Sequence, residues 1–151
     1  MDTPDQIYLR AAQRAQAQGL PYAGALLPTE AHQLLQQQNS AKLVDVRTKA
    51  EWEWVGRTPQ AVLVEWNTWP SGQANPAFLE QLSTQVPGLD TPVLFMCRSG
   101  GRSNSAAAAA ARAGYTRAYN VLQGFEGDKN EKGQRNSVGG WRAAGLPWSQ
   151  G

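Results

Sequence analysis

The sequence predicts an α/β fold with a central, mainly parallel sheet of about five strands and helices on both faces. Short segments rich in apolar and β-branched residues alternate with helical segments along the chain, and this alternation is typical of parallel sheets. Residues 93–96 are Val-Leu-Phe-Met, an apolar run that indicates a strand covered on both faces at the centre of such a sheet. Neither a repeat nor a linker interrupts the 151 residues.

Two helices are predicted in the N-terminal part of the chain. Residues 3–18 have a threonine at the cap position and a proline at the first helical position, which together favour the start of a helix. The Gly/Pro/Tyr-rich residues 19–24 end this helix, and Pro28 opens a second one that runs to about residue 38. We expect residues 1–38 to form a helical extension packed on or beside a main domain at residues 39–150.

The main domain contains the predicted strands. The six consecutive alanines at 106–111 are a strong helix signal, and the segments on either side match strands in length and composition. The predicted order is strand 41–46, short helix 50–55, strand 61–66, helix 76–85, strand 91–96, a helix that begins near Ser103, strand 117–122 and a short closing helix at 141–144.

Composition excludes several classes of protein. One cysteine forms no internal disulfide, which excludes a disulfide-stapled secreted scaffold and a redox dithiol. A formal net charge of +2 is too small and too dispersed to favour nucleic acid or a membrane as a partner. The first residues lack the features of a signal peptide, so we expect a cytoplasmic protein. With His32 as the one histidine, expected at the surface, we expect neither a metal site nor a cofactor.

A glycine-rich loop that begins with a cysteine carries the candidate chemistry. Cys97 follows the central strand and precedes a helix, which puts it at the carboxyl edge of the sheet, where α/β folds bind ligands. Gly100 and Gly101 permit a tight turn with inward N–H groups, and the helix start adds its positive dipole end. With Arg98 and Arg102 beside it, the loop favours a thiolate at Cys97 and a second anionic sulfur attached to it. The alternative is that Cys97 is a small buried apolar residue at the end of a strand.

Several further segments combine with this loop into a family pattern. The motifs are Leu43-Val44-Asp45-Val46-Arg47, Glu51-Trp52 with Gly56, the loop from Cys97 to Ser103, and Gly140-Trp141 with Gly145-Leu146-Pro147. Together they resemble the rhodanese-homology domain of sulfurtransferases from about residue 40 to residue 148. The loop is the most specific of these motifs. The resemblance implies a rhodanese-like, single-domain fold over residues 39–150.

The resemblance implies a persulfide mechanism with Cys97 as the catalytic residue. The Cys97 thiolate would take the outer sulfur of thiosulfate, or of a polysulfide or persulfide donor, and pass it to cyanide or a thiol. Because the chain has no second cysteine, an external nucleophile must discharge the intermediate. Arg98 and Arg102 would bind the anionic donor, and the N–H groups from Ser99 through Gly100 and Gly101 to Ser103 would stabilise the persulfide.

The resemblance also implies supporting residues and partners. Asp45 and Arg47 would hold the structure together near the loop, as a buried ion pair or a cap. The implied partners are a small anionic sulfur donor, a thiol or cyanide acceptor, and a sulfur-accepting protein. Two segments depart from the family: residues 56–58 are Gly-Arg-Thr where Gly-His-Ile is common, and residues 124–140 contain an insertion. We expect the insertion to be a solvated loop, with a role in access or docking as the alternative.

One other function stays open, and a second is disfavoured by the length of the loop. A non-catalytic rhodanese-like module would bind a protein partner, or act in regulation, through residues 124–140 or the N-terminal helix. A phosphatase or arsenate reductase needs Cys-x5-Arg, whereas Arg102 follows Cys97 by five positions, which makes the ring too small for a phosphate. Four tryptophans before the loop are expected to pack in the core: Trp52, Trp54, Trp66 and Trp69. The alternative for Trp66 and Trp69 is that they wall the sulfur pocket or an acceptor surface.

Overall fold

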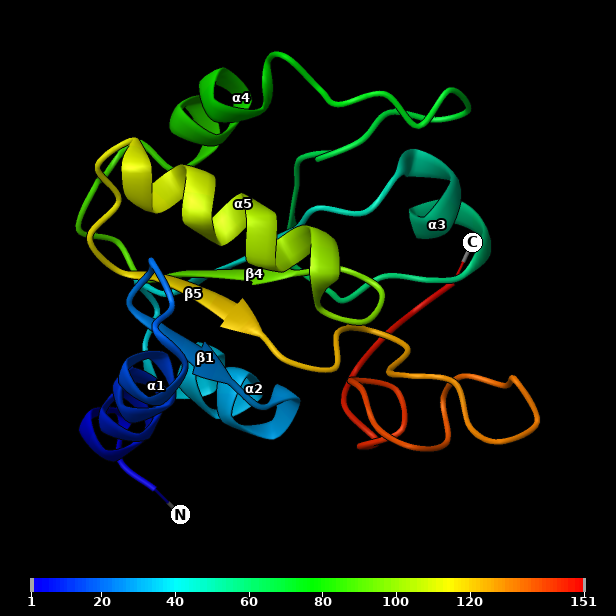
Figure 1. Cartoon of the computed structure of the whole chain (residues 1–151), viewed down its shortest axis with the longest axis horizontal. Coiled ribbons are helices and arrows are strands. Elements are labelled where there is room, and N and C mark those ends of the chain that lie inside the picture. The colour runs from blue at the N-terminus through cyan, green and yellow to red at the C-terminus, as the bar shows by residue number, and fades with distance from the viewer. Residues whose placement is uncertain (1, 151) are drawn as a thin grey trace.

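The computed structural model describes residues 2–150 and contains a five-stranded parallel sheet between two layers of helices (Figure 1). The strand order is β1-β5-β4-β2-β3, and every neighbouring pair is parallel. The elements are α1 (Pro4–Gln18), β1 (Gly24–Leu26), α2 (Pro28–Gln37), β2 (Lys42–Asp45), α3 (Lys49–Trp54), β3 (Val62–Leu63), α4 (Phe78–Gln85), β4 (Val93–Met96), α5 (Gly101–Arg112) and β5 (Ala118–Val121). The predicted α/β class, the sheet of about five strands and the helices on both faces are confirmed.

β4 is central because both of its faces are covered. It pairs with β2 on one side and with β5 on the other, and its four residues are fully buried. Successive side chains of a strand point to opposite faces, so Val93 and Phe95 join one core while Leu94 and Met96 join the other. The apolar run that predicted a central strand therefore supplies both cores.

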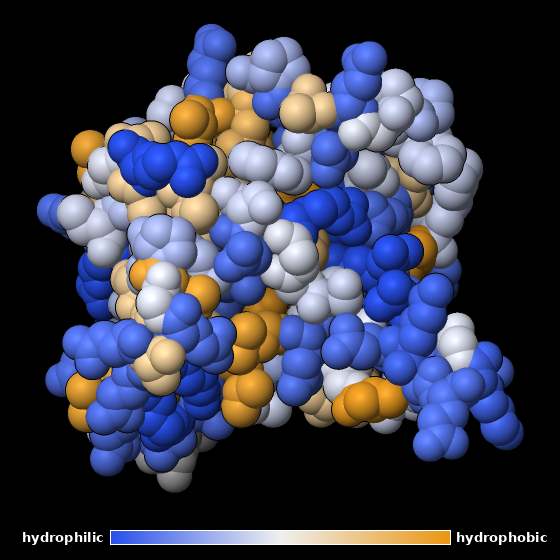
Figure 2. All heavy atoms as spheres, in the orientation of Figure 1, coloured by the Kyte–Doolittle hydropathy of each residue, from blue (hydrophilic) through white to orange (hydrophobic). Residues whose placement is uncertain are grey.

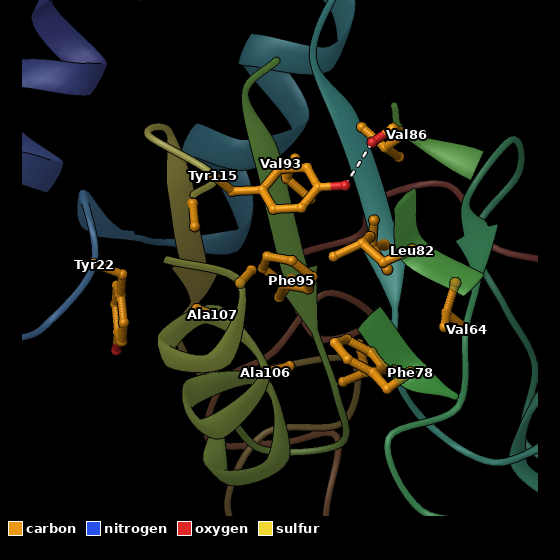
Figure 3. Close-up of a cluster of buried hydrophobic side chains, with 14 of the residues drawn as sticks. Tyr22, Val64, Phe78, Leu82, Val86, Val93, Phe95, Ala106, Ala107 and Tyr115 are labelled. Carbon is orange, nitrogen blue, oxygen red and sulfur yellow. Dashed lines mark hydrogen bonds between the residues drawn. The ribbon is translucent and has the colours of Figure 1, made fainter. Parts of the chain in front are cut away.

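The two cores lie under different pairs of helices. On one face α4 and α5 cover the sheet, with Phe78 and Ala107 among the buried contacts (Figure 3). On the other face α1 and α2 do the same through Ile7 and Leu34. The alanine run gives α5 a smooth face, so its backbone packs closely on β4 and β5. This close packing positions the start of α5 beside the end of β4.

The N-terminal segment contains a strand as well as two helices. α1 begins after Thr3, whose side chain accepts the Gln6 N–H, and ends at Gly19 with φ of 64°, as expected from the cap signals. β1 pairs with β5 at the edge of the sheet, where the sequence predicts no strand. Three residues without a β-branched side chain carry no local strand signal, so the pairing itself decides their conformation. Residues 1–38 are thus not purely helical, and their separation from a domain at 39–150 stays a prediction.

The predicted strand 61–66 is shorter than expected. Only Val62–Leu63 pair regularly with β2. The following residues stay beside β2, because the Val64 N–H donates to the Asp45 carbonyl and the Trp66 N–H to the Val46 carbonyl, at 3.1 and 3.0 Å. The predicted strand is therefore too long, but residues 64–66 still run beside β2 as expected.

The segment after β5 is anchored in the core at both of its ends. Phe125 is fully buried and Trp141 is 2% exposed, and both belong to the core beneath α1 and α2. Residues 131–134 between them are exposed, so the expectation of a solvated loop at 124–140 holds only for its middle. Residues 141–144 form turns instead of the predicted closing helix, because so short a segment makes too few helical hydrogen bonds to persist.

The face seen in Figure 2 is largely hydrophilic, with hydrophobic residues in scattered patches. Within residues 2–150 no helix is long and apolar enough to cross a membrane, and no group of three potential metal ligands occurs. His32 is half-buried, with its ring edge-on to Trp141 at 5.6 Å between centroids. His32 is thus only partly exposed at the surface, because Trp141 packs against its ring.

A substitution in β1 tests the contact between the N-terminal helix and the sheet. A Cβ atom at Gly24 would lie 2.7 Å from the backbone carbon and oxygen of Ala11, so Gly24→Ala forces α1 and β1 apart. We expect a loss of about 1–3 kcal/mol in the free energy of unfolding, measured by urea denaturation. Gly101→Ala is the matched control, because no atom lies within 4 Å of its added methyl group. Equal effects of both changes would contradict the close packing of α1 on β1.

Candidate active site

The strand, loop and helix bring the Cys97 sulfur to the carboxyl end of β4. Cys97 is 1% exposed, and its Sγ accepts a hydrogen bond from the Gly100 N–H at 3.2 Å. The chain turns back from Cys97 to Gly100 because Gly100 has φ of 110°, a conformation that residues with a Cβ rarely adopt. α5 begins at the next residue, and the N–H groups of its first turn have no acceptor within the helix. One backbone N–H group therefore contacts the cysteine sulfur directly, and the free N–H groups of the first turn of α5 follow it in the chain.

A buried chain of polar side chains supports the cysteine from the side of β5. Ser103 Oγ lies 3.3 Å from Cys97 Sγ and donates its proton to Asn120 Oδ1 at 2.6 Å. Asn120 Nδ2 in turn donates to the Gly100 carbonyl at 3.3 Å. With its proton directed to Asn120, Ser103 Oγ accepts from a neutral thiol, and rotation of the same hydroxyl lets it donate to a thiolate. Ser103 thus serves both protonation states of Cys97.

Asn120 is a site residue that sequence reasoning missed. The strand Ala118–Val121 is fully covered, and Asn120 is 4% exposed. A buried amide is costly unless it is hydrogen-bonded, and here the loop supplies its partners. The available signal was the single amide among the buried residues of a predicted strand.

Arg102 is engaged in an ion pair with Glu51. Its two terminal nitrogens donate to the two carboxylate oxygens of Glu51 at 2.7 and 2.9 Å, the two-pronged geometry that suits this pair. Glu51 Oε1 also accepts the Thr48 N–H in the capping box of α3. The ion pair therefore ties α3 to the first turn of α5. From the sequence we expect Arg102 to bind the sulfur donor, whereas in the structure Glu51 takes both of its terminal nitrogens.

The ion pair keeps Glu51 ionised. Burial by itself would raise the pKa of the Glu51 carboxyl. The hydrogen bonds and the positive charge of Arg102, together with the hydrogen bonds from Thr48, lower that pKa to about 2. Glu51 in turn helps to raise the pKa of Arg102 against the effect of burial. Both groups stay charged over the physiological range, and their charges cancel locally.

Arg98 differs from Arg102 in its surroundings. It is exposed, and it forms no ion pair within the part of the chain that the structure describes, residues 2–150. Its carbonyl accepts the N–H groups of Glu126 and Gly127 at 2.9 and 3.2 Å, which fixes the backbone while the side chain faces solvent. Arg98 thus offers an uncompensated positive charge next to Cys97.

Asp45 and Arg47 form a fully buried ion pair at the end of β2. Arg47 Nη2 donates to Asp45 Oδ2 at 2.7 Å and to the Gly56 carbonyl at 2.7 Å. The guanidinium also lies over the ring of Phe125, 4.3 Å from its centroid. These contacts connect β2, α3 and the segment after β5 beneath the loop. Through these hydrogen bonds the pair holds the end of β2 to the turn after α3.

A pocket of about 620 Å³ opens beside the loop. Arg98, Arg102 and Glu126 form its polar side, and residues of α3 and of the loop after β3 form its apolar side. Trp54 and Trp69 stand at its mouth, 70% and 59% exposed. A pocket of this size is typical of sites for ligands larger than a small inorganic anion.

The four tryptophans before the loop divide into two pairs. Trp52 is 6% exposed, and Trp66 packs edge-on against Phe78 at 4.9 Å between centroids, so the expectation of core packing holds for these two. For Trp54 and Trp69 it is wrong, because their rings are exposed and meet edge-on at 6.4 Å. Trp54 and Trp69 line the pocket beside the loop, whereas Trp66 does not; the alternative of a wall for the sulfur stays a prediction.

Comparison with protein families and curated relatives gives consistent matches. The family model described as "Rhodanese-like domain" matches residues 27–131. An uncharacterized protein of Rickettsia prowazekii, RP600, is 40% identical over 121 residues, which cover 80% of this chain and 92% of the relative. An uncharacterized protein of Rickettsia conorii, RC0915, is 33% identical over 125 residues with the same coverage.

Solved structures show the same relationship. Rv0390 from M. tuberculosis superposes with a TM-score of 0.79 at 47% identity, over 86% of this chain and 99% of that chain. The human single-domain sulfurtransferase TSTD1 has a TM-score of 0.50 at 27% identity, over 71% and 93% of the two chains. A polysulfide-sulfur transferase homodimer from Wolinella succinogenes shares the fold, with a TM-score of 0.60 at 20% identity over 100% and 95%.

The Glu51–Arg102 ion pair predicts a specific pH dependence of stability. Because the folded pKa of Glu51 is about 2, below the unfolded value, the contribution is complete above about pH 5 and is lost as the pH falls toward 2. We expect wild type to lose about 1–2 kcal/mol more than Glu51→Gln over this range, after allowance for partial solvent screening. Urea denaturation at several pH values measures this difference. Glu53→Gln, an exposed change on the same helix, is the control, and identical pH slopes in all three proteins would contradict the role of the pair.

Proposed function

The chain belongs to the rhodanese-like domain family, and from this premise we propose that it is a sulfurtransferase that carries sulfane sulfur as a persulfide on Cys97. The observation that carries the proposal is the loop geometry: the Cys97 sulfur accepts the Gly100 N–H at 3.2 Å at the start of a helix. Such donors stabilise a thiolate and, after reaction, an anionic sulfur bonded to it. A merely buried cysteine has no need of this arrangement.

The proposed reaction has two displacement steps. With thiosulfate as donor, the Cys97 thiolate attacks the outer sulfur, the S–S bond of thiosulfate breaks, and sulfite leaves with the bonding electron pair. Cyanide or an acceptor thiolate then attacks the outer sulfur of the persulfide, and Cys97 leaves as a thiolate. Backbone N–H groups from Ser99 to Ser103 stabilise the negative charge in both steps. Neither step requires a metal or a cofactor.

The surrounding residues support an anionic donor such as thiosulfate or a polysulfide. The exposed guanidinium of Arg98 attracts the anion to the pocket, because it forms no ion pair with a carboxylate within residues 2–150. Arg102 holds the loop through Glu51, and Asp45 with Arg47 holds the strand end beneath it. Because both terminal nitrogens of Arg102 donate to Glu51, only the remaining N–H groups of Arg102 are left for an anion. The short loop, in which Arg102 follows Cys97 by five positions, favours sulfur transfer over phosphoryl transfer.

Sulfur loading of Cys97 is the direct test. After incubation with thiosulfate or polysulfide, intact-protein mass spectrometry is expected to show a gain of about 32 Da on wild type, removed by cyanide, and no gain on Cys97→Ser. A wild type that takes up sulfur from neither donor would overturn the proposal and favour a non-catalytic rhodanese-like module. Sulfur uptake by Cys97→Ser would place the reactive group elsewhere.

The role of Arg98 has its own test. We expect Arg98→Ala to lower kcat/KM for thiosulfate by about tenfold, mainly through a higher KM, because one charge contact to the anion is worth roughly 1.4 kcal/mol. Arg112→Ala removes an exposed charge at the opposite end of α5 and is the control for net charge. Comparable kinetics of the two variants would remove Arg98 from donor binding.

A further inference from the structure

Trp54 and Trp69 form a pair of exposed aromatic rings at the mouth of the pocket that leads to the loop. Trp54 is the last residue of α3, and Trp69 lies in the loop between β3 and α4. Their rings meet edge-on at 6.4 Å and are 70% and 59% exposed. Large aromatic side chains left in water are costly, and tryptophan beside arginine is the composition of the energetic centre of protein interfaces.

Both tryptophans are presented by anchored backbone. In α3 the neighbouring Trp52 is buried at 6% exposure, which turns Trp54 two positions later to the opposite side of the helix. The loop that carries Trp69 is closed by hydrogen bonds, among them Gly72 N–H to the Thr68 carbonyl at 2.8 Å and Thr68 N–H to the Gln73 carbonyl at 2.9 Å. Rings held in this way lose little conformational entropy when a partner covers them.

The pocket is larger than the small substrates of the proposed reaction require. Thiosulfate and cyanide are compact ions that fit next to Arg98, whereas the pocket measures about 620 Å³ and continues along Val55 to the two tryptophans. Cys97 is only 1% exposed, so a reacting sulfur has to enter the loop on a narrow arm. The shape therefore suits a thiol on a slender side chain attached to a larger body.

The charges on the pocket wall suit a polypeptide. Arg98 and Glu126 both line the pocket, and neither takes part in an ion pair within residues 2–150. A wall with one unpaired charge of each sign complements a chain segment that carries side chains of both signs and amide dipoles. A small thiol has too little surface to cover two exposed indole rings as well.

We propose that Trp54 and Trp69 dock a protein segment whose cysteine, next to an aromatic or large apolar residue, is the sulfur acceptor. The inference rests on the proposed function and names the acceptor of the same site. In the transfer step the cysteine thiolate of the partner attacks the outer sulfur of the Cys97 persulfide. The new S–S bond forms on the partner, the Cys97–sulfur bond breaks, and Cys97 leaves as a thiolate.

The experiment separates loading of Cys97 from its discharge. The full chain is first loaded with thiosulfate or polysulfide, and the added sulfur is confirmed by mass before any acceptor is present. Discharge is then timed with cyanide, with 2-mercaptoethanol, with a short peptide whose one cysteine stands between two tyrosines, and with the same peptide carrying glycines in place of the tyrosines. The variant is Trp54→Ala/Trp69→Ala, and the control is Leu9→Ala/Val138→Ala, two residues of similar exposure outside this pocket.

We expect wild type to transfer sulfur to the tyrosine-flanked peptide about tenfold faster than to the glycine-flanked one, a preference that the tryptophan variant loses. Cyanide discharge stays within twofold, since cyanide does not reach the rings, and the control variant behaves as wild type. The docking proposal is overturned if the tryptophan variant keeps the preference, if its cyanide discharge slows equally, or if wild type prefers 2-mercaptoethanol to both peptides. If wild type takes up no sulfur, the loading step already shows it before any acceptor is added. That result overturns the proposed function, and the docking proposal with it.

Discussion

The complete burial of β4 between two helical layers is the constraint on which the rest of the molecule depends. A strand without a solvent-facing side can expose a residue only where it leaves the sheet, and parallel strands all end at the same edge. Cys97 at the end of β4 is therefore linked to Asn120 of β5 through Ser103, and it follows Met96, the register partner of Asp45 in β2. Segments far apart in the sequence form one site because their strands are neighbours. The close packing of the alanine face of α5 then brings its N-terminus to the same place.

The three arginines near the loop differ in what surrounds them, and this decides what each can do. Arg47 is buried with Asp45 at 0% side-chain exposure, where its charge holds β2 and the segment around Gly56 together. Arg102, with its side chain 25% exposed, is paired with Glu51 and fixes α3 against α5. Arg98 keeps its guanidinium in solvent at the pocket. From buried to exposed, the three arginines thus hold the strand end, fix the loop and, in the proposed function, attract an anion.

The aromatic residues also fall into a buried group that packs in the core and an exposed group at the pocket. Phe125 lies under Arg47 and meets Trp148 edge-on at 6.2 Å, which fixes the long segment after β5 to the core. Trp66 packs on Phe78 and anchors the start of the loop on which Trp69 stands. The buried members stabilise the segments that carry the exposed ones. Exposed rings on firmly held backbone are characteristic of recognition surfaces, since little order is gained or lost on binding.

The sequence by itself determined the order of helices α1 to α5 and of strands β2 to β5, the central position of β4 and the placement of Cys97 before a helix. These features depend on local patterns: an apolar run, cap residues around α1, glycines in a turn and a stretch of alanines. Tertiary structure alone decided that Gly24–Leu26 is a strand, that Arg102 pairs with Glu51 across 51 positions, that Asn120 holds the loop, and that Trp54 faces water while Trp52 does not. The physical reason is that hydrogen bonds, ion pairs and burial depend on which distant segments meet, whereas the conformation of a short segment is governed mainly by its own residues.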